Sequence, residues 1–252
     1  MMIECVPNFS EGARPDVIEA IVAKVRAQTG ARILDLQSDA SHNRSVLTLA
    51  GDPDSLSRSI LALIEACLAT IDLRSHRGEH PRLGAVDVVP FIPLEGATIK
   101  DCIALARRVG EAIAKRHNIP VFLYEDAASA PHRKGLEDIR RGQFEGLAEK
   151  LKDPLWAPDF GPSEPHPSFG AVVVGARMPL IAFNVNLNTD DVEIAKKIAK
   201  SIRHSTGGFR FVKAMGLLVE IGGGKVAQVS MNMTDFTRTP LFRVVETIRN
   251  EA

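Results

Sequence analysis

The sequence has little of three things that whole functional classes require: cysteine, aromatic side chains and an excess of charge. Its three cysteines, Cys5, Cys67 and Cys102, are too few and too scattered for a disulfide framework, and there is no CxxC pair to suggest structural zinc. Aromatic residues make up 5%, which disfavours a stacking platform for single-stranded nucleic acid. The 31 basic and 31 acidic residues cancel, so we expect no nucleic-acid partner that binds through a broad basic field.

Long apolar runs are also lacking. No run approaches the roughly 20 residues that span a bilayer, and residues 1–7 lack the basic region and apolar stretch of a signal peptide. We therefore expect a cytoplasmic protein with no membrane partner. What is present, 45% hydrophobic residues in a chain of 252, is enough for one large domain or two modest ones.

Short apolar runs alternate with amphipathic segments along the chain, a pattern typical of α/β and α+β proteins. Residues 125–169 are expected to be mostly irregular, as a linker or a lid. A turn at 222–225 is expected to join the last two strands as a hairpin. The pattern predicts strands at 3–6, 32–36, 45–50, 85–92, 120–124, 171–174, 180–187, 211–221 and 226–233, and helices at 15–30, 55–71, 100–116, 190–203 and 240–249.

The order of these elements predicts two subdomains. Within 180–252 it is β-α-β-β-α, a ferredoxin-like βαββαβ unit without its closing strand. The first part of the chain repeats a similar order. We therefore expect two ferredoxin-like α/β subdomains, 1–178 and 179–252, with a cleft between them, the second apparently truncated.

The strongest local signal is the loop from Arg74 to Arg82, which gathers two histidines, three arginines and a glutamate before an apolar strand. Histidine can accept and return a proton near neutral pH, a neighbouring carboxylate such as Glu79 can orient it, and arginines can receive substrate carboxylates. The alternative is a solvated charged turn, although Gly78 and Pro81 favour one fixed loop geometry.

The same loop matches the HxxEH pattern of zinc proteases from His76 to His80. That chemistry needs both histidines on one face of a helix. Gly78 and Pro81 disfavour a helix there, and no third zinc ligand stands at a recognisable spacing. We therefore expect no metal.

Two further polar loops follow predicted strands. In 37–44, the side chains of Asp39, His42, Asn43 and Arg44 can line a ligand site at the strand ends, or the aspartate and asparagine simply cap a turn. Asn8 follows the first strand, in a loop that opens a helix and suits an anion or a polar group.

Two other segments have polar groups that suit a binding site. The stretch 161–170, rich in proline and glycine, can present backbone amides and an aromatic face to a flat heterocycle, or it is only a surface loop. Asn184 and Asn186 place two amides on one face of a strand, lining a cleft or pairing across the sheet.

A series of ordered blocks resembles the formiminotransferase domain of the glutamate formimidoyltransferase family of folate enzymes, essentially from end to end. So many blocks in order are far more specific than any single motif. They are 4–12, 43–44, 71–72, 78–82, Gly84, 86–87, 90–93, 120–124, 139–140, 156–162, 175–177, 181–184 and 228–230.

The resemblance implies two α/β subdomains whose cleft accepts tetrahydrofolate as a co-substrate, and His80 as the catalytic histidine. It implies a one-carbon transferase of histidine degradation that acts on N-formimino-L-glutamate, and we expect a homodimer. Part of the folate site would be formed by Gly161, Pro162, Ser163, Glu164, Pro165, His166, Pro167, Ser168, Phe169 and Gly170.

A mechanism follows from the chemistry of this reaction. The N5 amine of tetrahydrofolate attacks the formimino carbon, and the adduct expels the glutamate nitrogen, giving 5-formimidoyltetrahydrofolate. One imidazole can remove the N5 proton and protonate the leaving nitrogen. We predict that His80 does so and that Asp39 or Glu79 steadies it. The predicted substrate-binding residues are Asn8, Asn43, Arg44, Arg77, Arg82 and Asn184.

Two other functions stay open from the sequence. One is a transferase of the same fold that moves a formyl group between 5-formyltetrahydrofolate and glutamate. The other is a catalytically incomplete folate-binding protein, which the short second subdomain favours.

Overall fold

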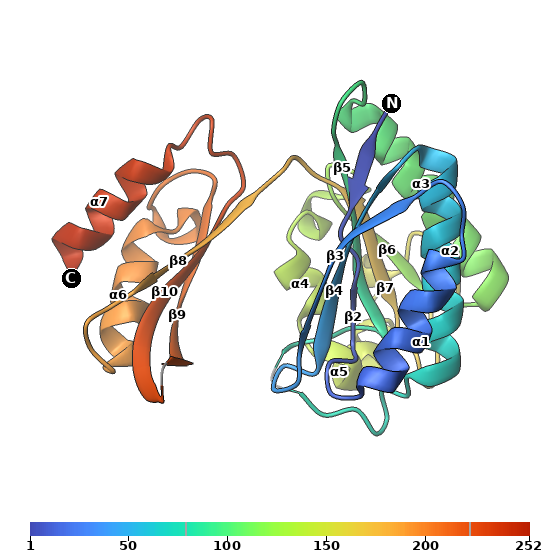
Figure 1. Cartoon of the computed structure of the whole chain (residues 1–252), viewed down its shortest axis with the longest axis horizontal. Coiled ribbons are helices and arrows are strands. Elements are labelled where there is room, and N and C mark those ends of the chain that lie inside the picture. Colours follow the sequence, from blue (N-terminus) through green and yellow to red (C-terminus); the bar gives the residue numbers. More distant parts are fainter. Residues whose placement is uncertain (79, 222) are drawn as a thin grey trace. The chain divides into compact units, whose positions relative to one another are not determined.

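The computed structural model describes residues 1–78, 80–221 and 223–252. The chain packs as two compact units, Met1–Arg177 and Met178–Ala252, each built on a sheet with helices (Figure 1). The sequence placed the boundary between residues 178 and 179. The expected mixed α/β class with two subdomains is confirmed.

The first unit begins with a ferredoxin-like segment. Its antiparallel strands lie in the order β3-β4-(β1, β2)-β5, and β7 and β6 extend the sheet beyond β5 in parallel. The elements are β1 (Ile3–Cys5), β2 (Asn8–Phe9), α1 (Pro15–Arg26), β3 (Arg32–Asp39), β4 (Arg44–Gly51), α2 (Pro53–Thr70), β5 (Val86–Pro93), α3 (Ile99–His117), β6 (Val121–Glu125), α4 (Leu136–Arg140), α5 (Gln143–Lys150) and β7 (Val172–Ala176).

Pro7 divides the first strand position into β1 and β2, because proline has no N–H to give to the ladder. Pairing continues across the break: the Val6 amide donates to the Pro90 carbonyl at 3.3 Å, and the Leu47 amide donates to the Pro7 carbonyl at 3.0 Å. β2 then pairs with both β4 and β5. This places Asn8 between two neighbouring strands in the sheet.

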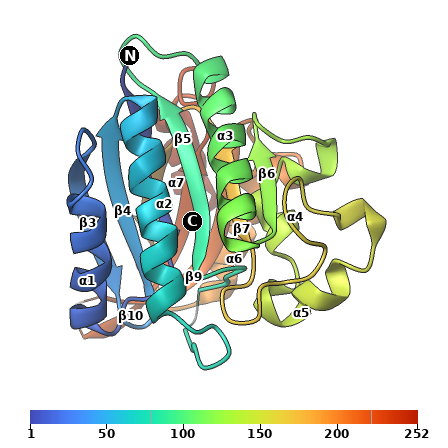
Figure 2. The ribbon, with the colours of Figure 1, turned by 90° about the vertical axis from the view of Figure 1, so that its right-hand side faces the viewer.

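Helices cover both faces of this sheet. α1, α2 and α3 lie side by side across one face, where Ile21, Ile60 and Val109 join the main core (Figure 2). On the other face Ile139 of α4 and Leu147 of α5 pack in a smaller apolar cluster. β7 contributes Val172 and Val174 to the first core and Val173 to the second. Burial on both faces explains the continuous apolar run of this strand.

Local sequence sets the ends of the long helices. The Asp52 carboxylate accepts hydrogen bonds from the Asp54 and Ser55 amides and caps α2. Thr98 and Asp101 form a capping box at the start of α3. α3 ends at Asn118, whose backbone is left-handed with φ +54°.

Residues 125–169, expected to be mostly irregular, contain short helices that the sequence did not predict. The segment contains α4, α5 and 3₁₀ turns at Pro131–Arg133 and Pro154–Trp156. Apolar residues at helical spacing, such as Phe144, Leu147 and Leu151, are present in the sequence, but each run is too short to stand out. This matters for function because α4 and α5 face the candidate site.

The second unit has the predicted β-α-β-β-α order. Its strands form an antiparallel sheet in the order β8-β10-β9, and α6 and α7 pack on one face of it. Ile221 pairs with Gly224, as in the predicted hairpin, while Gly222 lies outside the described residues. The elements are β8 (Ile181–Asn186), α6 (Val192–Ile202), β9 (Val212–Ile221), β10 (Gly224–Met233) and α7 (Leu241–Glu251).

Within the described ranges of both units, no helix combines the length and the apolarity needed to cross a membrane.

Candidate active site around His80

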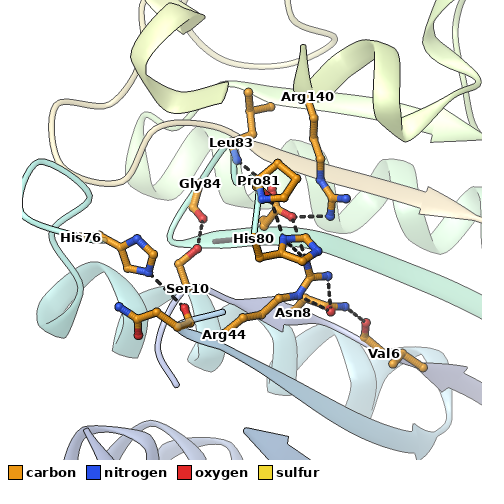
Figure 3. Close-up of polar contacts among 12 residues, drawn as sticks. Val6, Asn8, Ser10, Arg44, His76, His80, Pro81, Leu83, Gly84 and Arg140 are labelled. Atoms are coloured by element: carbon orange, nitrogen blue, oxygen red, sulfur yellow. Dashed lines mark hydrogen bonds and ion pairs between the residues drawn. The ribbon is translucent and has the colours of Figure 1, made fainter. Parts of the chain in front are cut away.

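His80 lies in the loop that leads into β5, beside the first residues of two other strands. Asn8 begins β2 and Arg44 begins β4. Because β2 pairs with both β4 and β5, these side chains come together although they are far apart in sequence. Figure 3 shows Asn8, Arg44 and Arg140 converging near the His80 ring. A small cavity here is lined by Phe9, Ser10, His42, Asn43, Arg44, His76, His80, Arg82 and Asp87.

The hydrogen bonds of the His80 ring define its tautomer. Nδ1 lies 2.7 Å from the Pro81 carbonyl oxygen, which can only accept, so Nδ1 carries the proton. Arg44 Nη1 contacts both ring nitrogens, and with Nδ1 protonated only the Nε2 lone pair can accept its hydrogen bond. His80 is therefore arranged as a neutral imidazole with Nε2 as its basic atom.

The surroundings keep this ring neutral. The pKa of His80 is lowered to about 4, mainly because burial disfavours the charged imidazolium and also because the Arg44 and Arg140 guanidiniums repel it. The Pro81 carbonyl and Asp87 act in the opposite direction but are outweighed. At neutral pH the ring can accept a proton but has none to give at Nε2.

Arg44 is held in place by an oriented amide. Its Nε donates to Asn8 Oδ1 at 2.9 Å, and its Nη2 donates to the same oxygen. Asn8 Nδ2 in turn donates to the Val6 carbonyl at 2.9 Å, which fixes the amide. Burial lowers the pKa of Arg44 to about 10, and Asp87 opposes this, so the guanidinium is charged at neutral pH.

Asp87 and Arg140 complete the cluster, and sequence reasoning gave neither a role. The Asp87 side chain is only 3% exposed. Its Oδ1 accepts from the Leu83 amide at 2.8 Å, and its Oδ2 accepts from Arg140 Nη2 and lies 3.9 Å from Arg44 Nη1. Both residues stand in blocks that carry the family resemblance, which was the available signal.

Arg140 is positioned by the way α4 ends. Lys150 Nζ donates to the carbonyls of Asp138 at 2.7 Å and Ile139 at 2.6 Å, which satisfies the last turn of that helix. The same ammonium lies 3.8 Å from the centroid of the Trp156 ring, a cation–π contact. The short helix thus presents Arg140 from a fixed end.

Arg82, expected to bind substrate, connects the His80 loop to α5. Its Nε donates to His76 Nδ1 at 3.1 Å, and its Nη2 donates to Glu145 Oε1 of α5 at 2.7 Å. His76 Nε2 donates to the Asn43 carbonyl at 3.0 Å. Arg82 is 8% exposed and its donors are used within the protein, while a place for it at the substrate stays a prediction.

The same contacts bear on the zinc-protease pattern. Both ring nitrogens of His76 are occupied, and His76 and His80 lie in a loop rather than on a helix. Across 1–78, 80–221 and 223–252, no group of three or more histidine, cysteine, aspartate or glutamate side chains could hold a metal ion.

Of the two carboxylates expected to steady His80, Asp39 contacts His42 instead. Asp39 Oδ1 accepts from the His42 amide at 2.8 Å, and Oδ2 lies 3.0 Å from His42 Nδ1. The His42 ring stands edge-on to His80 with centroids 6.2 Å apart, so Asp39 reaches His80 only through His42. Glu79 lies outside the described residues. The Pro81 carbonyl is the group that orients the His80 ring.

Asn43 and Arg77, also expected at the substrate, connect loops around the site. Asn43 Oδ1 accepts from the Gly12 amide at 2.9 Å, and Nδ2 donates to the Arg77 carbonyl at 2.7 Å. Arg77 is exposed, and its Nη1 donates to the His76 carbonyl at 2.8 Å. Its guanidinium lies at the surface beside the candidate site.

The stretch 161–170, expected to bind folate, lies against the His80 loop. Gly170 forms an antiparallel bridge with Gly84, the Leu73 amide donates to the Ser168 carbonyl at 2.8 Å, and the Ala85 amide donates to the Phe169 carbonyl at 2.8 Å. Phe169 itself is 0% exposed in the main core, so its ring offers no surface to a heterocycle. The rest of the stretch up to Ser168 is exposed or half-buried.

Asn184 lies in the second unit. It is exposed on β8 and pairs with Ser230 in the sheet. The neighbouring amide, Asn186, accepts at Oδ1 from Gln228 Nε2 at 2.8 Å. One of the two alternatives drawn from sequence, pairing across the sheet, thus holds for Asn186. A place for Asn184 at the substrate stays a prediction.

The chain matches known proteins over its whole length. Residues 2–177 match the family model of the formiminotransferase domain, N-terminal subdomain, and residues 182–252 match that of the formiminotransferase domain. It is 49% identical to glutamate formimidoyltransferase of Streptococcus pyogenes serotype M1, over 100% of this chain and 83% of that protein. Glutamate formimidoyltransferase of Thermoplasma acidophilum is 44% identical over 100% and 82%. Formimidoyltransferase-cyclodeaminase of Rattus norvegicus is 43% identical over 100% of this chain and 47% of that protein. The chain belongs to the formiminotransferase family.

Proposed function

We propose that this protein is a glutamate formimidoyltransferase in which His80 is the general acid/base. It moves the formimino group of N-formimino-L-glutamate to N5 of tetrahydrofolate. Two relatives that bear this enzyme's name match the whole chain at 49% and 44% identity. The observation that supports the role of His80 is its neutral ring, with the proton on Nδ1 and the Nε2 lone pair turned toward the Arg44 guanidinium.

The reaction balances with one imidazole. N5 attacks the formimino carbon, the new N5–C bond forms, and Nε2 takes the N5 proton. The imidazolium then gives this proton to the glutamate nitrogen as the C–N bond to that nitrogen breaks. The Pro81 carbonyl accepts a hydrogen bond from Nδ1–H throughout the reaction. This bond stabilises the imidazolium between the two proton transfers.

Several further assignments belong to this proposal. The stretch 161–168 and the backbone of 169–170 contact the folate, and Asn8, Asn43, Arg44, Arg77 and Asn184 contact the substrates. Asp39 acts on the site through His42. The protein works as a homodimer in histidine degradation. Its three free, buried cysteines fit the reducing conditions of the cytoplasm.

The test is product formation from tetrahydrofolate with N-formimino-L-glutamate or N-formyl-L-glutamate as the donor. We expect 5-formimidoyltetrahydrofolate from the first donor at a rate at least tenfold above that of the formyl product from the second. A preference for the formyl donor would contradict the proposed substrate. Folate binding by calorimetry with no product from either donor would contradict the proposed activity.

A further inference from the structure

The cluster around His80 contains more positively charged than negatively charged side chains. Arg44 and Arg140 both face the single carboxylate of Asp87, and His80 is neutral. The side chains of Arg44 and Arg140 are only 17% and 15% exposed, so water screens them poorly. A largely buried charge without a partner is costly. Within the described residues, the cluster therefore lacks one negative charge.

An unused hydrogen-bond donor lies in the same place. Arg140 Nε is buried and has no hydrogen-bond partner in the described part of the chain. Leaving such a donor unpaired costs about 1–3 kcal/mol, and more for a charged group. The surplus charge and the unused donor belong to guanidiniums on either side of Asp87. An anion with acceptor oxygens would balance the surplus charge and accept a hydrogen bond from the unused donor.

We propose that Arg140, together with Arg44, binds the α-carboxylate of the N-formimino-L-glutamate donor. This inference rests on the proposed function and adds a substrate-binding residue to it. The choice between the two substrate carboxylates follows from reach. Only Cα separates the α-carboxylate from the nitrogen that His80 must protonate, and Arg44 touches both His80 Nε2 and the Arg140–Asp87 pair. The side-chain carboxylate lies farther from that nitrogen.

Binding at this subsite also prepares the base. Arg44 Nη1 donates to His80 Nε2 in the free protein, where it blocks the lone pair. A carboxylate that binds the Arg44 guanidinium draws it away from Nε2 and frees the lone pair. The negative charge of the carboxylate also cancels part of the electrostatic repulsion between the guanidiniums and the imidazolium. Binding of the formimino donor thereby makes Nε2 of His80 available as a base, and proton transfer is favoured only when that donor is bound.

The experiment compares three donors on the wild type, Arg140→Gln, Arg140→Lys and a matched control, Arg141→Gln. Arg141 is the next residue, and its exposed guanidinium pairs with Asp138 at 2.9 Å. The donors are N-formimino-L-glutamate, its side-chain amide N-formimino-L-glutamine, and 4-(formimidoylamino)butanoate, which lacks only the α-carboxylate. Thermal unfolding confirms that each variant is folded.

We expect Arg140→Gln to lose about ten- to hundredfold in kcat/KM with the two donors that carry the α-carboxylate, the usual worth of a charged hydrogen bond. With 4-(formimidoylamino)butanoate its loss should stay below about threefold. Arg140→Lys should recover part of the loss, and Arg141→Gln should behave as wild type. An equal loss with all three donors would overturn the inference, because Arg140 would then act only through Asp87.

The two proposals fail in different ways. If the wild type does not turn over N-formimino-L-glutamate, the proposed function is wrong. If it does, but the loss in Arg140→Gln follows the side-chain carboxylate, the function stands and the subsite is wrong. Calorimetry with the product L-glutamate gives a readout without turnover: Arg140→Gln should weaken its binding about tenfold or more, and unchanged binding would contradict the subsite.

Discussion

At the scale of single residues, the chemistry depends on which nitrogen of His80 is free. The Pro81 carbonyl accepts a hydrogen bond from Nδ1–H, and the lone pair of Nε2 faces Arg44. Histidine, arginine and aspartate each have ordinary roles in proteins, but here His80, Arg44 and Asp87 line one small cavity. Their mutual effect is to hold the base in its neutral form and to leave a place for an anion.

The lowered pKa of His80 gives a pH prediction. Since kcat/KM reports the ionisation of the free enzyme, it should stay flat from pH 8 to below pH 6 and fall only as pH approaches about 4. Arg140→Gln removes one of the charges that lower this pKa, so its acid limb should move to higher pH. NMR titration of the His80 ring protons measures the same pKa directly. A midpoint near 6.5 in the wild type would contradict the assigned surroundings.

The same shift affects stability, with a definite sign. The folded-state pKa of His80 is below its ordinary value of 6.5, so the unfolded chain binds this proton first as pH falls. The contribution of His80 to the free energy of unfolding should therefore be constant above about pH 6.5 and should decrease between pH 6.5 and 4. Replacing His80 with glutamine should remove this part of the acid sensitivity.

Sequence alone predicted His80, Arg44 and Asn8 as site residues, and the structure brings these three together. It gave no role to Asp87 and Arg140, which come from different elements that only the folded sheet brings close. It assigned Arg82 to the substrate but could not show that this side chain also pairs with an internal partner. Glu145, that partner, stands on a helix that the sequence left undetected.

At the scale of elements, the approach of two loops positions the site. Gly84, just before β5, bridges to Gly170 at the end of the proposed folate stretch. A Cβ atom on Gly84 would lie 1.8 Å from the Ala171 carbonyl oxygen, which no side-chain rotation can relieve. The two segments can therefore meet only because residue 84 has no side chain.

Gly84→Ala should lower the free energy of unfolding by about 3 kcal/mol, the upper range for overpacking, and weaken folate binding. Denaturant unfolding and calorimetry are the measurements. Gly146→Ala is the matched control: a Cβ there meets nothing within 4 Å, and alanine in a helix should stabilise the protein by about 0.5–1 kcal/mol. If Gly84→Ala is as stable as the wild type and binds folate equally well, the loop contact does not position the site.

The sequence predicted the main strands and long helices because their periodicity and end signals extend over many residues. The apolar alternation of β4 and the capping box of α3 are examples. It missed α4 and α5 because two or three apolar residues per helix give too weak a periodic signal. The overlooked helices are the ones that bring Arg140 and Glu145 to the site.

At the scale of the whole molecule, both units follow the ferredoxin-like order that the sequence predicted, and the first is enlarged by two parallel strands. The cleft expected between the units stays a prediction. The cluster around His80, by contrast, is contained in the first unit, where its strands, α4 and the His80 loop meet.

A proposal in which His80 carries the proton needs no metal ion. Dialysis against a chelator should leave the turnover of N-formimino-L-glutamate unchanged. A loss of activity that a divalent cation restores would contradict this mechanism.

The most direct test of the account is turnover of N-formimino-L-glutamate with tetrahydrofolate by wild type, His80→Ala and a control, His204→Ala, whose histidine is exposed in the second unit. The account predicts that His80→Ala binds folate normally but loses about a hundredfold or more in rate, while His204→Ala matches the wild type. A His80→Ala protein that keeps its rate would contradict the assignment of His80 as the general acid/base.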